Sequence, residues 1–284
     1  MDKIVERVGF VGAGNMAEAL VGALVSSGLA DPGQILVSDL SEERKKHILD
    51  TYGVKSAGAG PLFDQSDVVI IAVKPKDVPG VLAEIARRPG FPPVQKKLVI
   101  SIAAGVRLES MEKILYEELS DSQRDLVPII RVMPNTPALV CSGMSGLAEN
   151  RHARKEDVEL AHKILAATGD ACRFKEEELD AVTAVSGSGP AYVFYLAEAM
   201  MRGAEEAGLS GEHARRLVTA TLTGAARMIR VRDEDPAELR RKVTSPGGTT
   251  EAAIRVLDEA GVADAVVRAI QAAARRSEEL GGKS

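Results

Sequence analysis

The alternation of short apolar runs with helix-length segments in the first half of the chain is the feature that most constrains the fold. Such alternation is typical of a parallel, doubly wound α/β sheet. The two central runs are almost continuously apolar, which predicts strands that are covered by helices on both faces and do not lie at a sheet edge. The predicted strands are Arg7–Val11, Gln34–Ser38, Val68–Val73, Leu98–Ile102, Ile129–Val132 and Met144–Ala148.

The second half of the chain carries only helical periodicity. Strand signals end near Lys175, and a helical pattern then runs to Leu209 with a Gly/Pro interruption between Gly187 and Pro190. Further helices are predicted from about Gly211 to Arg230 and from Asp235-Pro236 onward. Since 284 residues fit two domains of ordinary size, we predict a Rossmann-like α/β domain over residues 1–174 and an all-α domain over 175–284.

Charge and composition exclude several function classes. The chain has 36 basic and 41 acidic residues, well interspersed, which argues against nucleic-acid binding. Two cysteines, Cys141 and Cys172, supply neither a disulfide framework nor a metal site. No apolar run approaches the roughly 20 residues that span a bilayer, so we expect no membrane insertion. The segment Met1–Arg7 lacks the pattern of a signal peptide, so we expect a cytoplasmic protein.

A glycine-rich turn follows the first predicted strand and opens a helix. Gly12, Gly14 and Ala17 have the G-x-G-x-x-G/A spacing: the first residue permits a tight turn, the second lets a pyrophosphate approach the backbone, and the third allows close helix–strand packing. The free N–H groups at the helix start attract phosphates. We therefore predict dinucleotide binding by Val11, Gly12, Ala13, Gly14, Asn15 and Met16.

The residue at the end of the second predicted strand bears on the choice of cofactor. The carboxylate of Asp39 can accept hydrogen bonds from a ribose 2′-OH and repels a 2′-phosphate, which favours NADH over NADPH. Arg44, Lys45 and Lys46 follow closely. These cations are interpreted as a solvated helix face, with contact to a phosphate as the alternative, so both NADPH and NADH remain candidates.

Four further segments, taken together, resemble the pyrroline-5-carboxylate reductase family. They are Ala72–Pro75, Arg131–Pro137, Ser186–Tyr192 and, most specifically, Val243–Thr250 with the sequence VTSPGGTT. The likeness extends in order from Val8 to about Leu257. It implies reduction of L-1-pyrroline-5-carboxylate to L-proline by hydride transfer from NAD(P)H to the ring imine carbon, the last step of proline biosynthesis.

The resemblance also implies contacts and an assembly. Ala72, Val73, Lys74 and Pro75 are expected to lie against the cofactor, with Ala103 and Ala104 near the nicotinamide. The helical domain is expected to intertwine with a partner subunit, giving a homodimer or a ring of dimers. An apolar helical stripe that includes Leu217, Leu222, Ala225 and Ile229 is compatible with such an interface or with internal packing.

The substrate is assigned to the Ser-Pro-Gly-Gly-Thr-Thr segment. Backbone N–H groups at its two glycines, with the helix start that follows, can bind a carboxylate without Arg or Lys. The predicted substrate contacts are Ser245, Gly247, Gly248, Thr249 and Thr250. The resemblance makes Thr250 the catalytic residue, as a hydroxyl donor to the substrate nitrogen. The alternative for Ser245 and Thr250 is ordinary helix capping.

Several alternatives stay open from the sequence. The acids Asp233, Glu234 and Asp235 either touch the substrate amine or mark a helix entry. The Ser186–Pro190 segment is assigned mainly to packing, and the four histidines are expected to be solvated. Another imine or β-hydroxyacid reductase and a regulatory nucleotide-binding protein are the competing functions.

Overall fold

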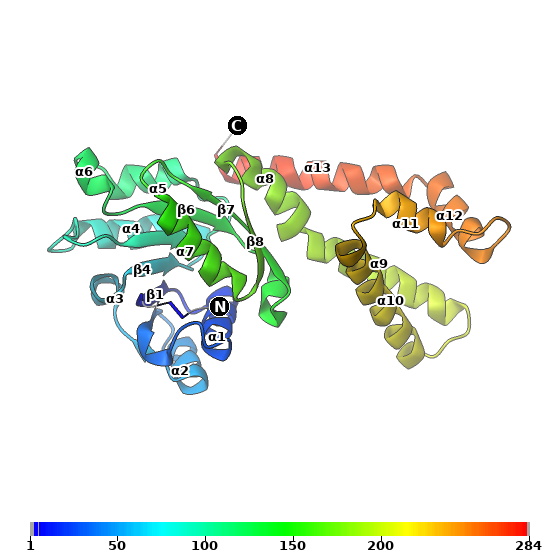
Figure 1. Cartoon of the computed structure of the whole chain (residues 1–284), viewed down its shortest axis with the longest axis horizontal. Coiled ribbons are helices and arrows are strands. Elements are labelled where there is room, and N and C mark those ends of the chain that lie inside the picture. The colour runs from blue at the N-terminus through cyan, green and yellow to red at the C-terminus, as the bar shows by residue number, and fades with distance from the viewer. Residues whose placement is uncertain (1–2, 5, 283–284) are drawn as a thin grey trace. The chain divides into compact units, whose positions relative to one another are not determined.

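The computed structural model describes residues 3–4 and 6–282 and divides into two compact units, each considered by itself (Figure 1). The first unit holds the residues up to Gly187 together with those from Ala274 onward. The second unit is Ser188–Ala273. The domain boundary at 174/175, which rests on the change in sequence periodicity, stays a prediction.

The first unit is built on one eight-stranded sheet with the order β3-β2-β1-β4-β5-β6-β7-β8. Neighbouring strands from β3 to β6 are parallel. All six predicted strands are confirmed, and the runs at 68 and 98 form the central strands β4 and β5. The strands are β1 Val8–Val11, β2 Ile35–Ser38, β3 Lys55–Ser56, β4 Val68–Ile71, β5 Leu98–Ser101, β6 Ile129–Met133, β7 Gly143–Glu149 and β8 Gly169–Arg173.

The sheet departs from the predicted all-parallel arrangement at one side. Strand β7 runs antiparallel to β6, with Arg131 opposite Ala148. A parallel pairing needs a crossover of about a dozen or more residues, and the link between Met133 and Gly143 is shorter and holds only a 3₁₀ turn. Strand β8 then pairs parallel with β7.

Helices cover both faces of the sheet, as the continuous apolar strands predicted. In β4, Val68 and Ile70 pack in one core with helices α1, α2 and α7, whereas Val69 and Ile71 pack in a second core with α3, α4 and α5. This alternation follows from the two-residue period of a strand. The helices are α1 Asn15–Ser26, α2 Glu42–Tyr52, α3 Ala59–Gln65, α4 Val78–Arg87, α5 Leu108–Leu115, α6 Asp121–Arg124, α7 Lys155–Ala166 and α8 Leu179–Val182.

The order of the strands marks one edge of the sheet as the place where a ligand is expected. Strands β1, β4, β5 and β6 are neighbours and parallel, so their carboxyl ends meet at one edge. The chain leaves β1 toward β2 on one side, while β4 lies on the other side. A crevice at such a reversal is the usual ligand site of an open α/β sheet.

The second unit is helical, as predicted. Gly208 has a φ of +98° just beyond the end of α9, and the side chain of Asp235 accepts a hydrogen bond from the N–H of Ala237 at the start of α11. No helix among the described residues has the length and apolar character needed to cross a membrane. The helices are α9 Gly189–Glu206, α10 Gly211–Arg232, α11 Pro236–Lys242, α12 Thr249–Glu259 and most of α13 Val262–Leu280.

A single copy of the second unit has almost no core. Within Ser188–Ala273 only Ala214 and Val218 are buried, although α9 and α10 pack against each other. Large apolar side chains stay open, among them Phe194 at 61% exposed and Leu217 at 54%. A helical segment of this size requires a buried apolar face for stability. The interface alternative for the stripe at Leu217 and Ile229 is therefore favoured over internal packing.

We expect Leu217→Asp to weaken self-association by at least tenfold. Burial of the Leu217 side chain in an interface would contribute about 1.5–3 kcal/mol, and the substitution replaces it by a charge that is costly to bury. Light scattering and the concentration dependence of the unfolding midpoint measure this. Val94→Asp, which alters an exposed valine of the first unit, is the control. A wild-type monomer with concentration-independent unfolding at micromolar levels would contradict the expectation.

Candidate active site

The glycine turn is held between two strand ends. The N–H of Gly12 donates to the carbonyl of Ser38 at 2.7 Å, and Val11 accepts from the N–H of Ala72 at 2.8 Å. Gly12 has a φ of +109°, and a Cβ built on it would lie 2.6 Å from the carbonyl oxygen of Ala72. Only glycine fits this position, because both the conformation and the space exclude a side chain.

The structure around Gly14 fits a bound pyrophosphate. Gly14 precedes α1 in extended conformation, with φ −70°, and a Cβ built there meets no atom within 4 Å. The first-turn N–H groups of a helix have no intrahelical acceptor and attract anions. Ala17 is buried in the core against the sheet, as predicted. Open space in front of free backbone donors is the feature that the dinucleotide prediction requires.

The half-buried Asp39 carboxylate braces the glycine turn. Its Oδ2 accepts a hydrogen bond from the N–H of Ala13 at 2.6 Å, and its Oδ1 accepts from the N–H of Ser41 at 2.7 Å. Each carboxylate oxygen has two lone pairs, so this bracing leaves acceptor capacity for a ribose hydroxyl. The carboxylate therefore has a structural task that the sequence did not indicate.

The cations after Asp39 are in three different situations. Arg44 donates to the carbonyl of Ala13 at 2.9 Å and forms an ion pair with Glu18 at 2.7 Å. Burial raises the pKa of Glu18, but hydrogen bonds from His47 and Arg44 outweigh it and hold that pKa below its usual value. Lys45 pairs with Glu42, and Lys46 is exposed. Arg44 is thus a brace of the glycine turn and not a freely solvated cation.

The other predicted cofactor residues follow the neighbouring strands. Ala72 and Val73 come directly after β4, and Lys74 and Pro75 lead into a short 3₁₀ turn. Ala103 and Ala104 follow β5; the Ala103 side chain is buried and Ala104 is exposed. The sheet order brings all these segments to the edge that holds the glycine turn.

The predicted substrate residues lie in the second unit, before and at the start of α12. The N–H of Gly248 donates to the carbonyl of Ser245 at 3.0 Å, and the N–H of Gly247 donates to the Glu251 carboxylate at 2.7 Å. The expectation that both glycine N–H groups are unobstructed is therefore wrong for the isolated chain. The first-turn N–H groups of Thr249 and Thr250 have no helical acceptor and remain as donors.

Helix capping does not account for the two hydroxyl residues. Gly248 is the N-cap of α12, and no side chain caps this helix end. Neither Ser245 nor Thr250 therefore has the capping role that was the alternative. The Thr250 hydroxyl has no hydrogen-bond partner among the described residues, so it is available to a ligand.

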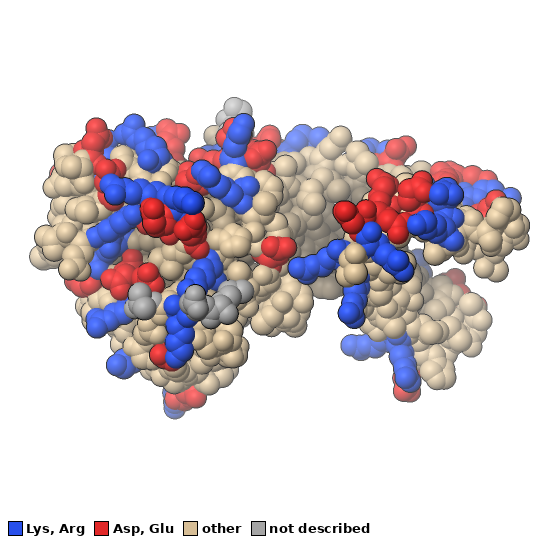
Figure 2. Space-filling view, in the orientation of Figure 1, with Lys and Arg blue, Asp and Glu red and all other residues tan. Residues whose placement is uncertain are grey.

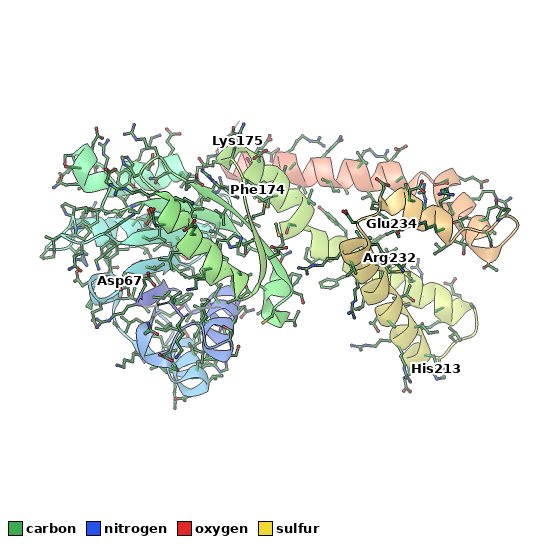
Figure 3. All side chains as sticks on the ribbon, in the orientation of Figure 1. Asp67, Phe174, Lys175, His213, Arg232 and Glu234 are labelled. Carbon is green, nitrogen blue, oxygen red and sulfur yellow. The ribbon has the colours of Figure 1, made fainter. Side chains whose placement is uncertain are left out.

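The acidic cluster marks a helix entry. Asp233 ends α10 with a φ of +51°, and Asp235 caps α11. Glu234 lies beyond the end of α10 near Arg232 (Figure 3) and pairs with Lys242, whose hydrogen bond lowers the pKa of the Glu234 carboxyl. These contacts favour the structural alternative for the cluster.

Asn135 lies within one of the four motifs, but no role was predicted for it. Its Nδ2 donates to the Ser186 hydroxyl at 3.1 Å and to the Ser186 carbonyl at 3.2 Å, while its Oδ1 accepts from the N–H of Met144 at 2.9 Å. Ser186 lies in a π-helical turn, Thr183–Gly187. A Cβ on Gly187 would lie 2.5 Å from Cε of Met133, in line with the packing role assigned to this segment.

The prediction for the histidines is wrong at His152. This side chain is buried, not solvated: its Nδ1 lies 2.8 Å from Oδ1 of Asp125, and its ring stands edge-on to Tyr116. Burial raises the pKa of Tyr116 above its usual range. This group lies near the amino end of β6, away from the glycine turn.

Two further features of the surface lie away from the predicted site residues. A hollow of about 720 Å³ is lined by α4, by α5 and by the segments that follow each, with Arg87, Phe91 and Lys113 among its residues, and it contains none of the predicted site residues. Basic and acidic side chains are mixed over the visible face of the first unit (Figure 2). Neither feature competes with the edge formed by the carboxyl ends of β1, β4, β5 and β6, which remains the candidate site.

Two family models match the chain. The model for pyrroline-5-carboxylate reductase dimerisation covers residues 176–280, and the model for NADP oxidoreductase, coenzyme F420-dependent, covers residues 7–105. A curated pyrroline-5-carboxylate reductase from Pseudomonas aeruginosa is 42% identical over 277 residues, covering 96% of each chain.

Solved structures agree with these matches over nearly the full length. A pyrroline-5-carboxylate reductase from Coxiella burnetii superposes with a TM-score of 0.88 at 36% identity, covering 98% of this chain and 99% of that one. A pyrroline carboxylate reductase from Plasmodium falciparum, solved with NADP bound, gives a TM-score of 0.84 at 27% identity with the same coverage.

The two glycines of the turn are expected to respond differently to alanine. Gly12→Ala should destabilise the protein by about 1–3 kcal/mol, because it combines a strained φ with a clash. Gly14→Ala should fold normally yet lose at least roughly tenfold in NAD(P)H affinity, because its Cβ enters the space of the pyrophosphate. Thermal unfolding and fluorescence titration separate the two. Unchanged cofactor affinity in a folded Gly14→Ala protein would refute the cradle.

Proposed function

Since this chain belongs to the pyrroline-5-carboxylate reductase family, we infer that it reduces L-1-pyrroline-5-carboxylate to L-proline with NAD(P)H, the last step of proline biosynthesis. The observation that carries this conclusion is the full-length match to curated reductases, 37–42% identical over 95% or more of this chain in three of them. The glycine turn at the switch point of the sheet supplies the expected cofactor cradle.

The cofactor, when bound, supplies the hydride that adds to the ring imine carbon. We propose that Val11–Met16 hold its pyrophosphate and that Asp39 faces its adenosine ribose. The segment after β4 is proposed to lie against the cofactor, and Ala103 and Ala104 after β5 to lie near its nicotinamide. In this arrangement the chain contributes orientation. Binding holds the two reactants in near-attack geometry, so the translational freedom that the reaction in solution must lose is already lost before hydride transfer.

The substrate carboxylate is proposed to bind at the start of α12. Glu251 already accepts a hydrogen bond from the N–H of Gly247, which supports the ability of this loop to hold a carboxylate. Thr250 is proposed to donate its hydroxyl to the substrate nitrogen. A hydroxyl is a weak acid at neutral pH, so its task is orientation, and the proton comes from water or from an already protonated imine.

The chain is a homo-oligomer through its helical unit. The open apolar faces of α9 and α10 support a dimer as its basic unit, and a ring of dimers is proposed as the larger form.

The predicted cytoplasmic location stays a prediction.

The role of Thr250 is tested by comparing Thr250→Ala with Thr250→Ser. Removing the hydroxyl should lower kcat/KM for L-1-pyrroline-5-carboxylate by roughly tenfold to a hundredfold, the value of one or two well-placed hydrogen bonds, whereas serine should restore most of it. Initial rates of NADH and NADPH oxidation measure both. Absence of turnover in folded, cofactor-binding wild-type protein would refute the reductase assignment itself.

The preference for NADH is tested at Asp39. In Asp39→Asn the repulsion of a 2′-phosphate is lost, so the ratio of NADPH to NADH efficiency should rise by roughly tenfold, equivalent to about 1.4 kcal/mol. The loss of bracing at Ala13 affects both cofactors alike, so the ratio isolates the effect at the 2′-position. Asp50→Asn, the same change at an exposed carboxylate of α2 to which no cofactor contact is assigned, serves as the control. An unchanged ratio in Asp39→Asn would show that this carboxylate does not select the cofactor.

A further inference from the structure

The last turns of α13 are fastened to the first unit by a buried polar group, which we call the C-terminal clasp: Arg107, Asp180, Ser277 and Gly281. Arg107 Nη2 lies 2.9 Å from Asp180 Oδ2, and the Ser277 hydroxyl donates to Asp180 Oδ1 at 2.8 Å. Arg107 Nε donates to the carbonyl of Gly281 at 3.0 Å. These contacts join segments that lie far apart in the sequence.

The charges in the clasp are removed from water. The Asp180 side chain is 3% exposed and that of Arg107 is 13% exposed. Burying such a pair costs free energy unless each group is well hydrogen-bonded, and replacing it by apolar residues is often neutral or stabilising. Net stability alone therefore does not account for this buried ion pair, whereas the geometry that it imposes on the segments it joins can.

Arg107 ends the loop that carries the predicted nicotinamide contacts. At the beginning of this loop, Ile102 donates its N–H to the carbonyl of Ile71, which ties the loop to the sheet. At its other end, Arg107 is the N-cap residue of α5. Ala103 and Ala104 lie between these two anchors, so the position of Arg107 limits the paths open to them.

The same loop passes close to the end of α13 at Gly105. Gly105 has a φ of +77°, and a Cβ built on it would lie 3.8 Å from Leu280. Just beyond Arg107, the N–H of Leu108 donates to Glu176 at 2.7 Å, and Glu176 in turn accepts from the buried Arg131 of β6 at 3.2 Å. The loop is thus fixed by the sheet on one side and by the end of α13 on the other.

We propose that the C-terminal clasp positions the nicotinamide end of the cofactor, with Asp180 as a positioning residue that acts through Arg107. This inference rests on the proposed function only for the identity of the ligand near Ala103 and Ala104. Hydride transfer is sensitive to misplacement of about 1 Å, so a loop held at both ends gives the enzyme a fixed nicotinamide position.

The test separates the nicotinamide end of the cofactor from the rest. The affinities for NADH and for ADP-ribose, and for NADPH and for 2′-phospho-ADP-ribose, are measured by titration calorimetry on wild type, Ser277→Ala and Asp180→Asn. Glu279→Gln is the matched control, because it removes an exposed ion pair with Arg276 in the same turns of α13. Thermal unfolding and light scattering establish that each variant is folded and assembled.

We expect Ser277→Ala to weaken binding of the whole cofactor by roughly threefold to tenfold, the value of one hydrogen bond, and to leave binding of the truncated nucleotide unchanged. The kcat for the reductase reaction should fall by a similar factor at unchanged KM for the imine. If Asp180→Asn fails to fold, Ser277→Ala carries the test alone, since it removes only a hydroxyl.

Equal effects on whole and truncated nucleotides, or a lowered unfolding temperature with unchanged affinities, would overturn the proposal and leave the clasp as a fastening of α13. The affinity comparison does not depend on turnover. A wild-type protein without reductase activity would therefore refute the proposed function while the clasp is still judged by the ratio of affinities.

Discussion

Parallel strands that lie side by side must end at the same edge of their sheet, and the candidate site depends on this constraint. The turn after β1 meets the turn after β4 so closely that Gly12 has no room for a Cβ beside the Ala72 carbonyl. The segments after β5 and β6 follow in order along the same edge. The segments proposed to hold the pyrophosphate, the ribose and the nicotinamide are thereby brought together from positions that are dispersed over the first half of the chain.

The central part of the fold was predictable because its strands are buried and its turns need special residues. The missed strands show the reverse case: Lys55 and Ser56 in β3 are exposed, and most of β8 is open, so neither carries an apolar pattern. The antiparallel direction of β7 depends on the length of a connection, which periodicity does not report. The predicted helix ends at Gly208 and Asp235 were right because glycine and aspartate have defined roles there.

The site was predictable where backbone geometry demands a residue type and unpredictable where side chains meet across the fold. Gly12 and Gly14 stand out in the sequence, whereas the bonds from Asp39 to Ala13 and from Asn135 to Ser186 require the tertiary structure. His152 resembled a solvated residue because its neighbours in sequence are charged, yet Asp125 and Tyr116 enclose it. Nothing in the sequence around Asp180 or Ser277 indicates a role, because the two residues are far apart in the chain and form their hydrogen bond only in the folded structure.

Because Ser188–Ala273 has almost no core of its own, the concentration of assembled enzyme is not expected to rise in simple proportion to the concentration of the chain. The proposed substrate loop, Ser245–Thr250, belongs to this unit, so its framework is expected to depend on the pairing of two chains. Pair formation follows the square of the chain concentration while most chains are single. In that range, halving the concentration of the chain leaves only about a quarter of the assembled dimer.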